Sequence, residues 1–260
     1  MSATQAQQSI ETWPERLWIV RHGESAGNVA LAAAEKAGLP RIEIDHRDQD
    51  VPLSELGREQ SRTLGRWFGS LPEADRPTVV VCSPFVRAMQ TAELLVESAG
   101  LSLAGPVMDE RLREKEFGHL DRYTKAGITA QFPDEVSLRE RLGKFYYRPP
   151  GGESWCDVIL RLRSFVDSVQ LQFRHERVLV VGHQVIVLCF RYLLERMTES
   201  QILAIDREKD VANCSVTSYV LRTDAAGRPS LDLSAYNFVA PLEAADTKVT
   251  KEPDRPAKLE

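Results

Sequence analysis

The sequence predicts an α/β fold of the three-layer sandwich type, with a mostly parallel central sheet flanked by helices. Short apolar or β-branched runs recur at 17–20, 78–82 and 178–181. Each run ends in a turn that carries histidine, serine or charge, and a segment compatible with a helix follows each turn. Repeated strand, turn and helix units are typical of parallel sheets covered by crossover helices.

The first half of the chain supplies two of these units. Residues 17–20 predict a buried strand, and the Ala-rich residues 24–36 predict a helix that stops before Gly38 and Pro40. The further elements predicted here, in order, are an irregular loop over 42–53, a helix from Ser54 to Gly69, a strand over 78–82, a helix over 85–100 and a short strand over 106–108.

The second half begins with a polar excursion at about 120–150, which we expect to form a short cap. Ser154, with Asp157 three residues on, predicts the start of an amphipathic helix. The later elements predicted are a strand over 178–181, a helix over 185–197, and strands over 215–222 and 231–238, one of them antiparallel or at an edge.

Length and composition predict one domain. The 260 residues, 43% hydrophobic and 27% charged, can bury a single core, which we place at 1–240. Residues 241–260 are charged, contain proline and have few apolar side chains, so they predict a disordered tail.

Charge and hydropathy restrict the partners. The net charge of −5 excludes the global basic field that non-specific nucleic-acid binding needs. Apolar runs are too short to cross a bilayer, and the N-terminus lacks the pattern of a signal peptide. The four cysteines form no C-x-x-C pair, which favours a reducing cytoplasm. We expect a cytoplasmic protein that binds neither nucleic acid nor membrane, and apolar helix faces allow a homodimer.

Four motifs carry the functional prediction. They are RHGES at 21–25, SPFVRAMQTAE at 83–93, RLREKEFG at 111–118 and VGHQ at 181–184. In this order they resemble the phosphoglycerate mutase-like histidine phosphatase superfamily, over roughly the first two hundred residues. Three of the motifs follow predicted parallel strands, whose carboxyl ends meet at one edge of a sheet, so we expect their turns to converge.

The resemblance implies that His22 is a nucleophile that forms a phosphohistidine. A neutral imidazole can attack phosphorus without a separate base. Arg21 and Arg87 would bind the phosphoryl oxygens with permanently charged, planar groups and disfavour imidazolium at His22. His183 would donate a hydrogen bond to the transferred phosphoryl group. The remaining phosphate or substrate contacts expected are Ser25, Asn28 and Gln184.

Expelling an alkoxide at neutral pH requires a general acid, and a carboxyl group can supply the proton. Related sequences place this acid four positions before a glycine. Glu114 has that spacing to Gly118, whereas Glu116 lies two residues later and remains an alternative. The same glutamate would then deprotonate the water that hydrolyses the phosphohistidine.

Structural roles for the same residues stay open. Arg87 would also suit a helix surface, paired with Glu93, and Glu114 would suit a solvated pair with Arg111 or Arg113. The agreement of four ordered motifs favours the functional interpretation.

The resulting prediction is a phosphomonoester hydrolase that acts on a small phosphorylated metabolite. One alternative is a cofactor-dependent phosphoglycerate mutase, with Lys125 as a carboxylate contact. Another is a catalytically silent module that binds a phosphorylated ligand. His46, His119 and His175 have no partners at metal-ligand spacing, so neither a metal nor an organic cofactor is implied.

Overall fold

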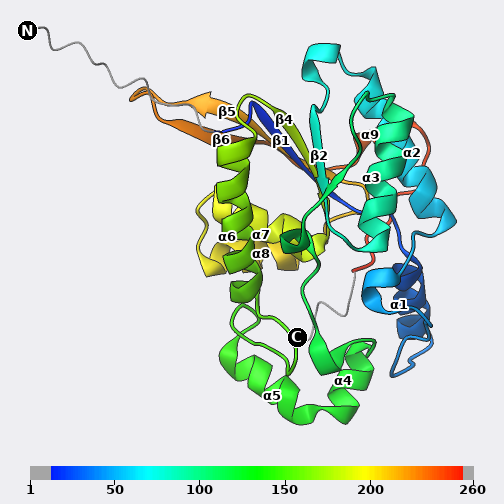
Figure 1. Cartoon of the computed structure of the whole chain (residues 1–260). Coiled ribbons are helices and arrows are strands. Elements are labelled where there is room, and N and C mark those ends of the chain that lie inside the picture. Colours follow the sequence, from blue (N-terminus) through cyan, green and yellow to red (C-terminus); the bar gives the residue numbers. More distant parts are fainter. Residues whose placement is uncertain (1–12, 254–260) are drawn as a thin grey trace, which may run out of the picture.

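The computed structural model describes residues 13–253, which form a six-stranded sheet of order β3-β2-β4-β1-β5-β6 (Figure 1). The strands are β1 (Arg16–Arg21), β2 (Val79–Cys82), β3 (Val107–Met108), β4 (Arg177–Gly182), β5 (Val216–Thr223) and β6 (Pro229–Phe238). The pairs β2–β3, β2–β4 and β1–β4 are parallel, whereas β1–β5 and β5–β6 are antiparallel. The predicted mostly parallel sheet is therefore confirmed, with one late strand antiparallel and the other at an edge.

Helices cover both faces of the sheet. They are α1 (Ala26–Lys36), α2 (Glu55–Ser70), α3 (Val86–Ala99), α4 (Lys125–Gln131), α5 (Pro133–Leu142), α6 (Trp155–Gln172), α7 (Gln184–Leu194), α8 (Glu199–Glu208) and α9 (Ala240–Ala244). Figure 1 shows α6, α7 and α8 on one side of the sheet and α2, α3 and α9 on the other. None of the helices within 13–253 is long and apolar enough to span a membrane.

Alternation along β1 divides the core between these two layers. Leu17 and Ile19 pack into the cluster that contains α6 and α7, whereas Trp18 and Val20 pack with α2 and α3. All four side chains are buried. Successive strand residues point to opposite faces, so one strand serves two apolar layers. This packing is the predicted three-layer sandwich.

Serine caps fix where three of the helices begin. Ser25 and Ser154 form capping boxes at α1 and α6, and the Ser54 hydroxyl accepts from the Gly57 N–H at the start of α2. The predicted helix starts at Ser54 and Ser154 are confirmed. Because α1 starts directly after the turn that follows β1, its N-terminus lies at the same edge of the sheet as the predicted site.

The excursion at 120–150 contains α4 and α5, which lie beyond one end of the sheet in Figure 1. Leu120, Ile128 and Tyr147 form a small apolar cluster of their own there. The excursion is thus held by local packing, separate from the two layers that cover the sheet.

The prediction of a disordered tail from residue 241 is wrong for residues 241–253. Leu242 is buried in α9, and Thr250 is only 3% exposed. The segment is ordered because its hydroxyl and main-chain groups bond to buried polar side chains, Gln60 in α2 and Asn213 before β5, partners that a rule based on composition does not count. Residues 254–260 lie outside the described residues.

Candidate active site

His22 follows β1 and is fully buried. Its Nδ1 lies 2.6 Å from the Gly23 carbonyl oxygen, and its Nε2 accepts a 3.2 Å hydrogen bond from Arg87 Nε. A carbonyl can only accept and a guanidinium can only donate, so the proton belongs on Nδ1 and the lone pair on Nε2. The contacts therefore select the neutral tautomer whose lone pair points toward a fixed positive charge.

Arg87, near the start of α3, also has partners other than the imidazole of His22. Its Nη1 donates to the Asp48 carbonyl oxygen at 2.7 Å and lies 3.3 Å from Asp48 Oδ1. The guanidinium stacks over the Phe85 ring, 5.0 Å from its centroid. The acid bound to Arg87 is thus Asp48, and Glu93 is exposed.

His183 lies in a third turn, directly after β4. The centroids of the His183 and His22 rings are 5.1 Å apart. His183 Nε2 lies 2.8 Å from the Ser83 hydroxyl, which follows β2. The turns after β1, β2 and β4 therefore meet, as predicted from the parallel strand order.

Arg21 and Asn28 lie on either side of the turn that carries His22. Both side chains donate to main-chain carbonyls from later parts of the chain. Arg21 Nη1 donates to the Val211 carbonyl at 2.6 Å, and its Nη2 donates to the Glu252 carbonyl at 2.5 Å. Asn28 Nδ2 donates to the carbonyls of Glu252 and Pro253 at 3.2 and 3.0 Å. Main-chain carbonyls thus accept from two of the side chains that were expected to bind phosphate.

The other two expected contacts have local partners. The Ser25 hydroxyl accepts from the Asn28 N–H and donates to Asn28 Oδ1, which completes the cap of α1. Gln184 begins α7, and its Nε2 donates to Asp210 Oδ1 at 3.1 Å. Ser25 lies three positions after His22, and Gln184 directly follows His183. Their contacts hold the starts of α1 and α7, the helices that follow these two histidines.

The loop at residues 22–24, which carries His22, packs closely against the main chain of α2. A Cβ added at Gly23 would lie 2.4 Å from the Gly57 carbonyl oxygen, so no side chain fits at that position. The Gly23 N–H donates to the Thr91 hydroxyl, which in turn donates to the Arg87 carbonyl. This chain of contacts joins the loop that carries His22 to the helix that carries Arg87.

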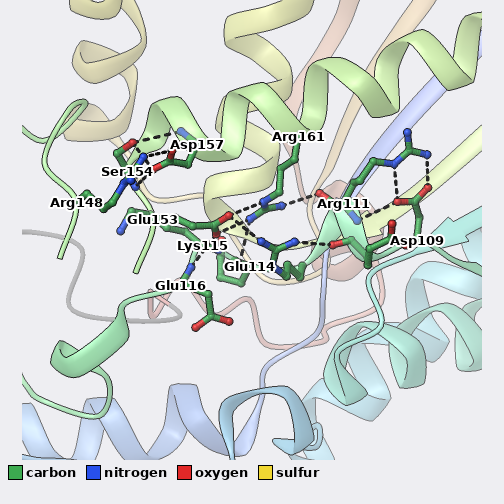
Figure 2. Close-up of polar contacts among 12 residues, drawn as sticks. Asp109, Arg111, Glu114, Lys115, Glu116, Arg148, Glu153, Ser154, Asp157 and Arg161 are labelled. Carbon is green, nitrogen blue, oxygen red and sulfur yellow. Dashed lines mark hydrogen bonds and ion pairs between the residues drawn. The ribbon is translucent and has the colours of Figure 1, made fainter. Parts of the chain in front are cut away.

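Glu114 is the more buried of the two candidate acids. It is 1% exposed, and its Oε1 accepts a 2.7 Å hydrogen bond from the Lys115 N–H. Glu116 is half-buried, and Figure 2 shows its carboxylate directed away from the neighbouring ion pairs. Burial therefore favours Glu114 as the carboxyl that can be kept protonated.

An ion pair behind this segment holds its main chain. Glu153 accepts from Arg161 through both carboxylate oxygens, at 2.9 and 3.0 Å, and from Arg113 at 2.9 Å (Figure 2). The Glu116 N–H adds a fourth hydrogen bond. Burial alone would raise the pKa of Glu153, but the hydrogen bonds and charges of Arg161 and Arg113 outweigh it and lower that pKa.

Arg161 also reaches the acid segment itself. It donates to the carbonyls of Arg111, at 2.6 Å, and Glu114, at 3.2 Å. Arg111 binds the carboxylate of Asp109, and Arg113 binds Glu153. Both arginines considered as surface partners for Glu114 are thus engaged with other carboxylates.

The profile of the histidine phosphatase superfamily, branch 1, matches residues 17–231. The chain belongs to this superfamily. It is 30% identical to a 2,3-bisphosphoglycerate-dependent phosphoglycerate mutase of Gloeobacter violaceus, over 74% of the chain and 81% of the relative. It is 29% identical to phosphoglycerate mutase-like protein AT74H of Arabidopsis thaliana, over 77% and 72%.

Solved structures of histidine phosphatases have the same fold. A mycobacterial glucosyl-3-phosphoglycerate phosphatase, in complex with VO3, matches 86% of this chain and all of its own, with 27% identity and a TM-score of 0.64. Phosphatases and mutases thus both occur among the relatives. This chain is an enzyme of the histidine phosphatase type, which disfavours the alternative of a silent binding module.

Two thiols lie close to the catalytic turns of this histidine phosphatase. Burial raises the pKa of Cys82 and of Cys214 to about 12. Both therefore stay protonated at neutral pH, whereas the thiolate is the nucleophilic form of cysteine. Among residues 13–253, no group of three or more His, Cys, Asp or Glu side chains could hold a metal ion.

Several residues of the site were not predicted from the sequence. Asp48 lies in a loop without periodicity, and Asn213 lies between predicted elements. Asn213 Nδ2 donates to the His22 carbonyl at 3.1 Å, across 191 positions of sequence. Ser83 belongs to one of the converging turns, but the sequence pattern predicts no contact between it and His183. No local pattern marks such contacts, because the partner residues are distant in the sequence.

Proposed function

We propose that this enzyme hydrolyses phosphomonoesters of small metabolites in two steps through a phosphohistidine on His22. The observation that carries the proposal is the tautomer of His22, with Nδ1 tied to the Gly23 carbonyl and Nε2 accepting from Arg87. A lone pair beside a fixed cation is where an electron-poor phosphoryl group with anionic oxygens would bind.

In the first step, Arg87 Nε transfers its hydrogen bond from His22 Nε2 to a phosphoryl oxygen. The freed lone pair of Nε2 forms a bond to phosphorus while the bond to the ester oxygen breaks. Glu114 gives its proton to that departing oxygen, and its burial supports this role. In the second step, Glu114 takes a proton from water, the water oxygen bonds to phosphorus, and the bond to His22 breaks. Phosphate leaves, and His22 and Glu114 return to their starting states.

The remaining residues would stabilise the charge on the phosphoryl oxygens. Arg87 and His183 contact or face the His22 ring, so they are the first candidates to donate to these oxygens. Arg21 adds a buried positive charge next to His22. Asn28, Ser25 and Gln184 would act at the rim or through the start of the helices.

A mutase is the second candidate, because a mutase is among the most similar relatives. It would return the phosphoryl group to a bound acceptor instead of to water. Lys125, exposed at the start of α4, would then contact a substrate carboxylate. The relatives' names contain phosphoglycerate in both the mutase and the phosphatase, so phosphoglycerate derivatives belong at the head of any substrate panel.

We further propose a reducing, cytoplasmic setting. Cys82, Cys189 and Cys214 are buried free thiols, and Cys156 is a half-buried one. Thiols that remain unpaired are typical of proteins in reducing compartments.

The test is phosphate release from a panel of phosphomonoesters, including phosphoglycerates, in the presence of a chelator. Wild type should release phosphate, and His22→Gln should lose at least about 10³-fold in kcat. His119→Gln changes an exposed histidine in the same way and should keep activity. Isomerised phosphoglycerate without phosphate release would instead support the mutase, and full activity of His22→Gln would refute the proposal.

A further inference from the structure

The chain returns to the active site after α9, through residues 247–253, which we call the return segment. It lies beyond the part of the chain that matches the superfamily profile. Thr250 is its buried residue, at 3% exposure, and the Asn213 N–H donates to the Thr250 carbonyl at 2.9 Å. Farther along, the Glu252 carbonyl accepts from Arg21. The segment thus packs around residues 22–24, which we call the nucleophile loop.

The hydroxyl group of Thr250 makes two hydrogen bonds. It donates to Asn213 Oδ1 at 2.9 Å and accepts from Gln60 Nε2 at 3.0 Å. Asn213 and Gln60 are both fully buried. Water therefore cannot easily replace the hydroxyl between these two amides.

The opposite ends of the same two amides hold the main chain on either side of the nucleophile. Asn213 Nδ2 donates to the His22 carbonyl at 3.1 Å. Gln60 Oε1 accepts from the Glu24 N–H at 2.8 Å. The Thr250 hydroxyl thus bonds to both of the amides that hold the main chain at residues 22–24.

The hydrogen-bonding capacities of these groups require this arrangement. A main-chain carbonyl only accepts, so Asn213 must present its NH₂ group to His22, and a main-chain N–H only donates, so Gln60 must present its oxygen to Glu24. Asn213 then needs a donor at its far end, and the NH₂ group of Gln60 needs acceptors, which are the Thr250 hydroxyl and the Lys248 carbonyl. A hydroxyl offers both at once, whereas an aliphatic side chain offers neither.

We propose that Thr250 is a positioning residue for the nucleophile, because it orients the two amides that hold the peptide groups around His22. This inference rests on the proposed role of His22. Loss of the hydroxyl would remove the donor to Asn213 Oδ1 and would leave Gln60 Nε2 with the Lys248 carbonyl as its acceptor. Both amides would be held less firmly, and the nucleophile loop would move relative to Arg87. Small displacements of a reacting group reduce the rate of the chemical step more than they reduce binding.

The test compares Thr250→Val, Thr250→Ser and Thr247→Val with wild type, using p-nitrophenyl phosphate. Thr247 is the matched control, because its hydroxyl lies on the same segment but contacts Thr63, 3.0 Å away and outside the site. We expect Thr250→Val to lower kcat by roughly 10- to 100-fold with KM changed by less than about threefold. Thr250→Ser should restore most of the rate, and Thr247→Val should behave like wild type.

Single-turnover formation of the phosphoenzyme separates positioning from a general loss of folded protein. The rate per folded molecule should fall in Thr250→Val, with thermal unfolding used to confirm that the variant is folded. If it does not fold, Thr250→Ala removes the hydroxyl without adding a methyl group. A wild-type rate of phosphoenzyme formation in folded Thr250→Val or Thr250→Ala overturns the inference while leaving the role of His22 intact. Full activity of His22→Gln overturns the proposed function itself.

Discussion

The main chain around His22 and the main chain around Glu114, which are the two halves of the proposed site, are held in different ways. Around His22, neutral groups fix the loop: the amides of Asn213 and Gln60 and the hydroxyl of Thr91. Around Glu114, a largely buried ion pair between Glu153 and Arg161, with side chains 12% and 10% exposed, fixes the chain. Charged side chains occur in both halves, but the main chain next to His22 bonds to neutral side chains, whereas the main chain of the acid segment bonds to Arg161 and Glu153.

This difference follows from what each half must do. Arg87 already has Asp48 as a partner, and a further carboxylate beside His22 would compete with the phosphoryl group for Arg87 or alter the protonation of the imidazole. Behind the acid, permanent cations instead keep Glu153 ionised, because their hydrogen bonds and charges lower its pKa despite burial. Glu153 is thereby unsuited to act as the general acid, which supports our proposal that Glu114 is the proton donor. Two carboxyl groups in one region thus serve separate purposes.

Of the changes that test this comparison, Glu114→Gln should have the largest effect on kcat/KM. For an alkyl phosphate, whose leaving group needs a proton, kcat/KM should fall by about 10²- to 10⁴-fold. For p-nitrophenyl phosphate, whose leaving group is stable as an anion, the fall should be much smaller. Glu116→Gln is the matched control and should change either substrate little. A larger loss in Glu116→Gln would move the acid to that residue.

A smaller effect concerns stability and pH. Glu153→Gln should lower the free energy of unfolding by about 3 kcal/mol at neutral pH, because Arg161 and Arg113 lose their charged partner. The pKa of Glu153 is lowered in the folded protein, so its contribution is fully present above its ordinary value of 4.5 and is lost as the pH falls through the lowered pKa.

Urea unfolding of wild type and Glu153→Gln across this acidic range measures the effect. The difference between the two proteins should shrink as the pH falls below 4.5. Glu55→Gln, which removes an almost fully exposed partner of Arg58, is the control and should have little effect at any pH. A difference that does not change with pH would show that the charge of Glu153 is not what stabilises the acid segment.

The sequence predicts the parts of this molecule that are local. Apolar runs and capping serines placed the main strands and helices, and the order of strands and turns brought His22, Arg87 and His183 together. Asp48 and Thr250 could not be found this way, because each acts through a partner far along the chain: Arg87 for Asp48, and Gln60 and Asn213 for Thr250. The tail was misjudged for the same reason, since its order depends on polar contacts and not on apolar content.

The most direct test of the central claim is to find where the phosphoryl group resides during turnover. Glu114→Gln should slow hydrolysis of the phosphoenzyme, because the base that activates water is missing, while p-nitrophenyl phosphate can still phosphorylate it. Peptide mapping of this variant, quenched under alkaline conditions that preserve phosphohistidine, should locate one phosphoryl group on His22. A phosphoryl group on another residue, or turnover with no phosphoenzyme, would contradict the account.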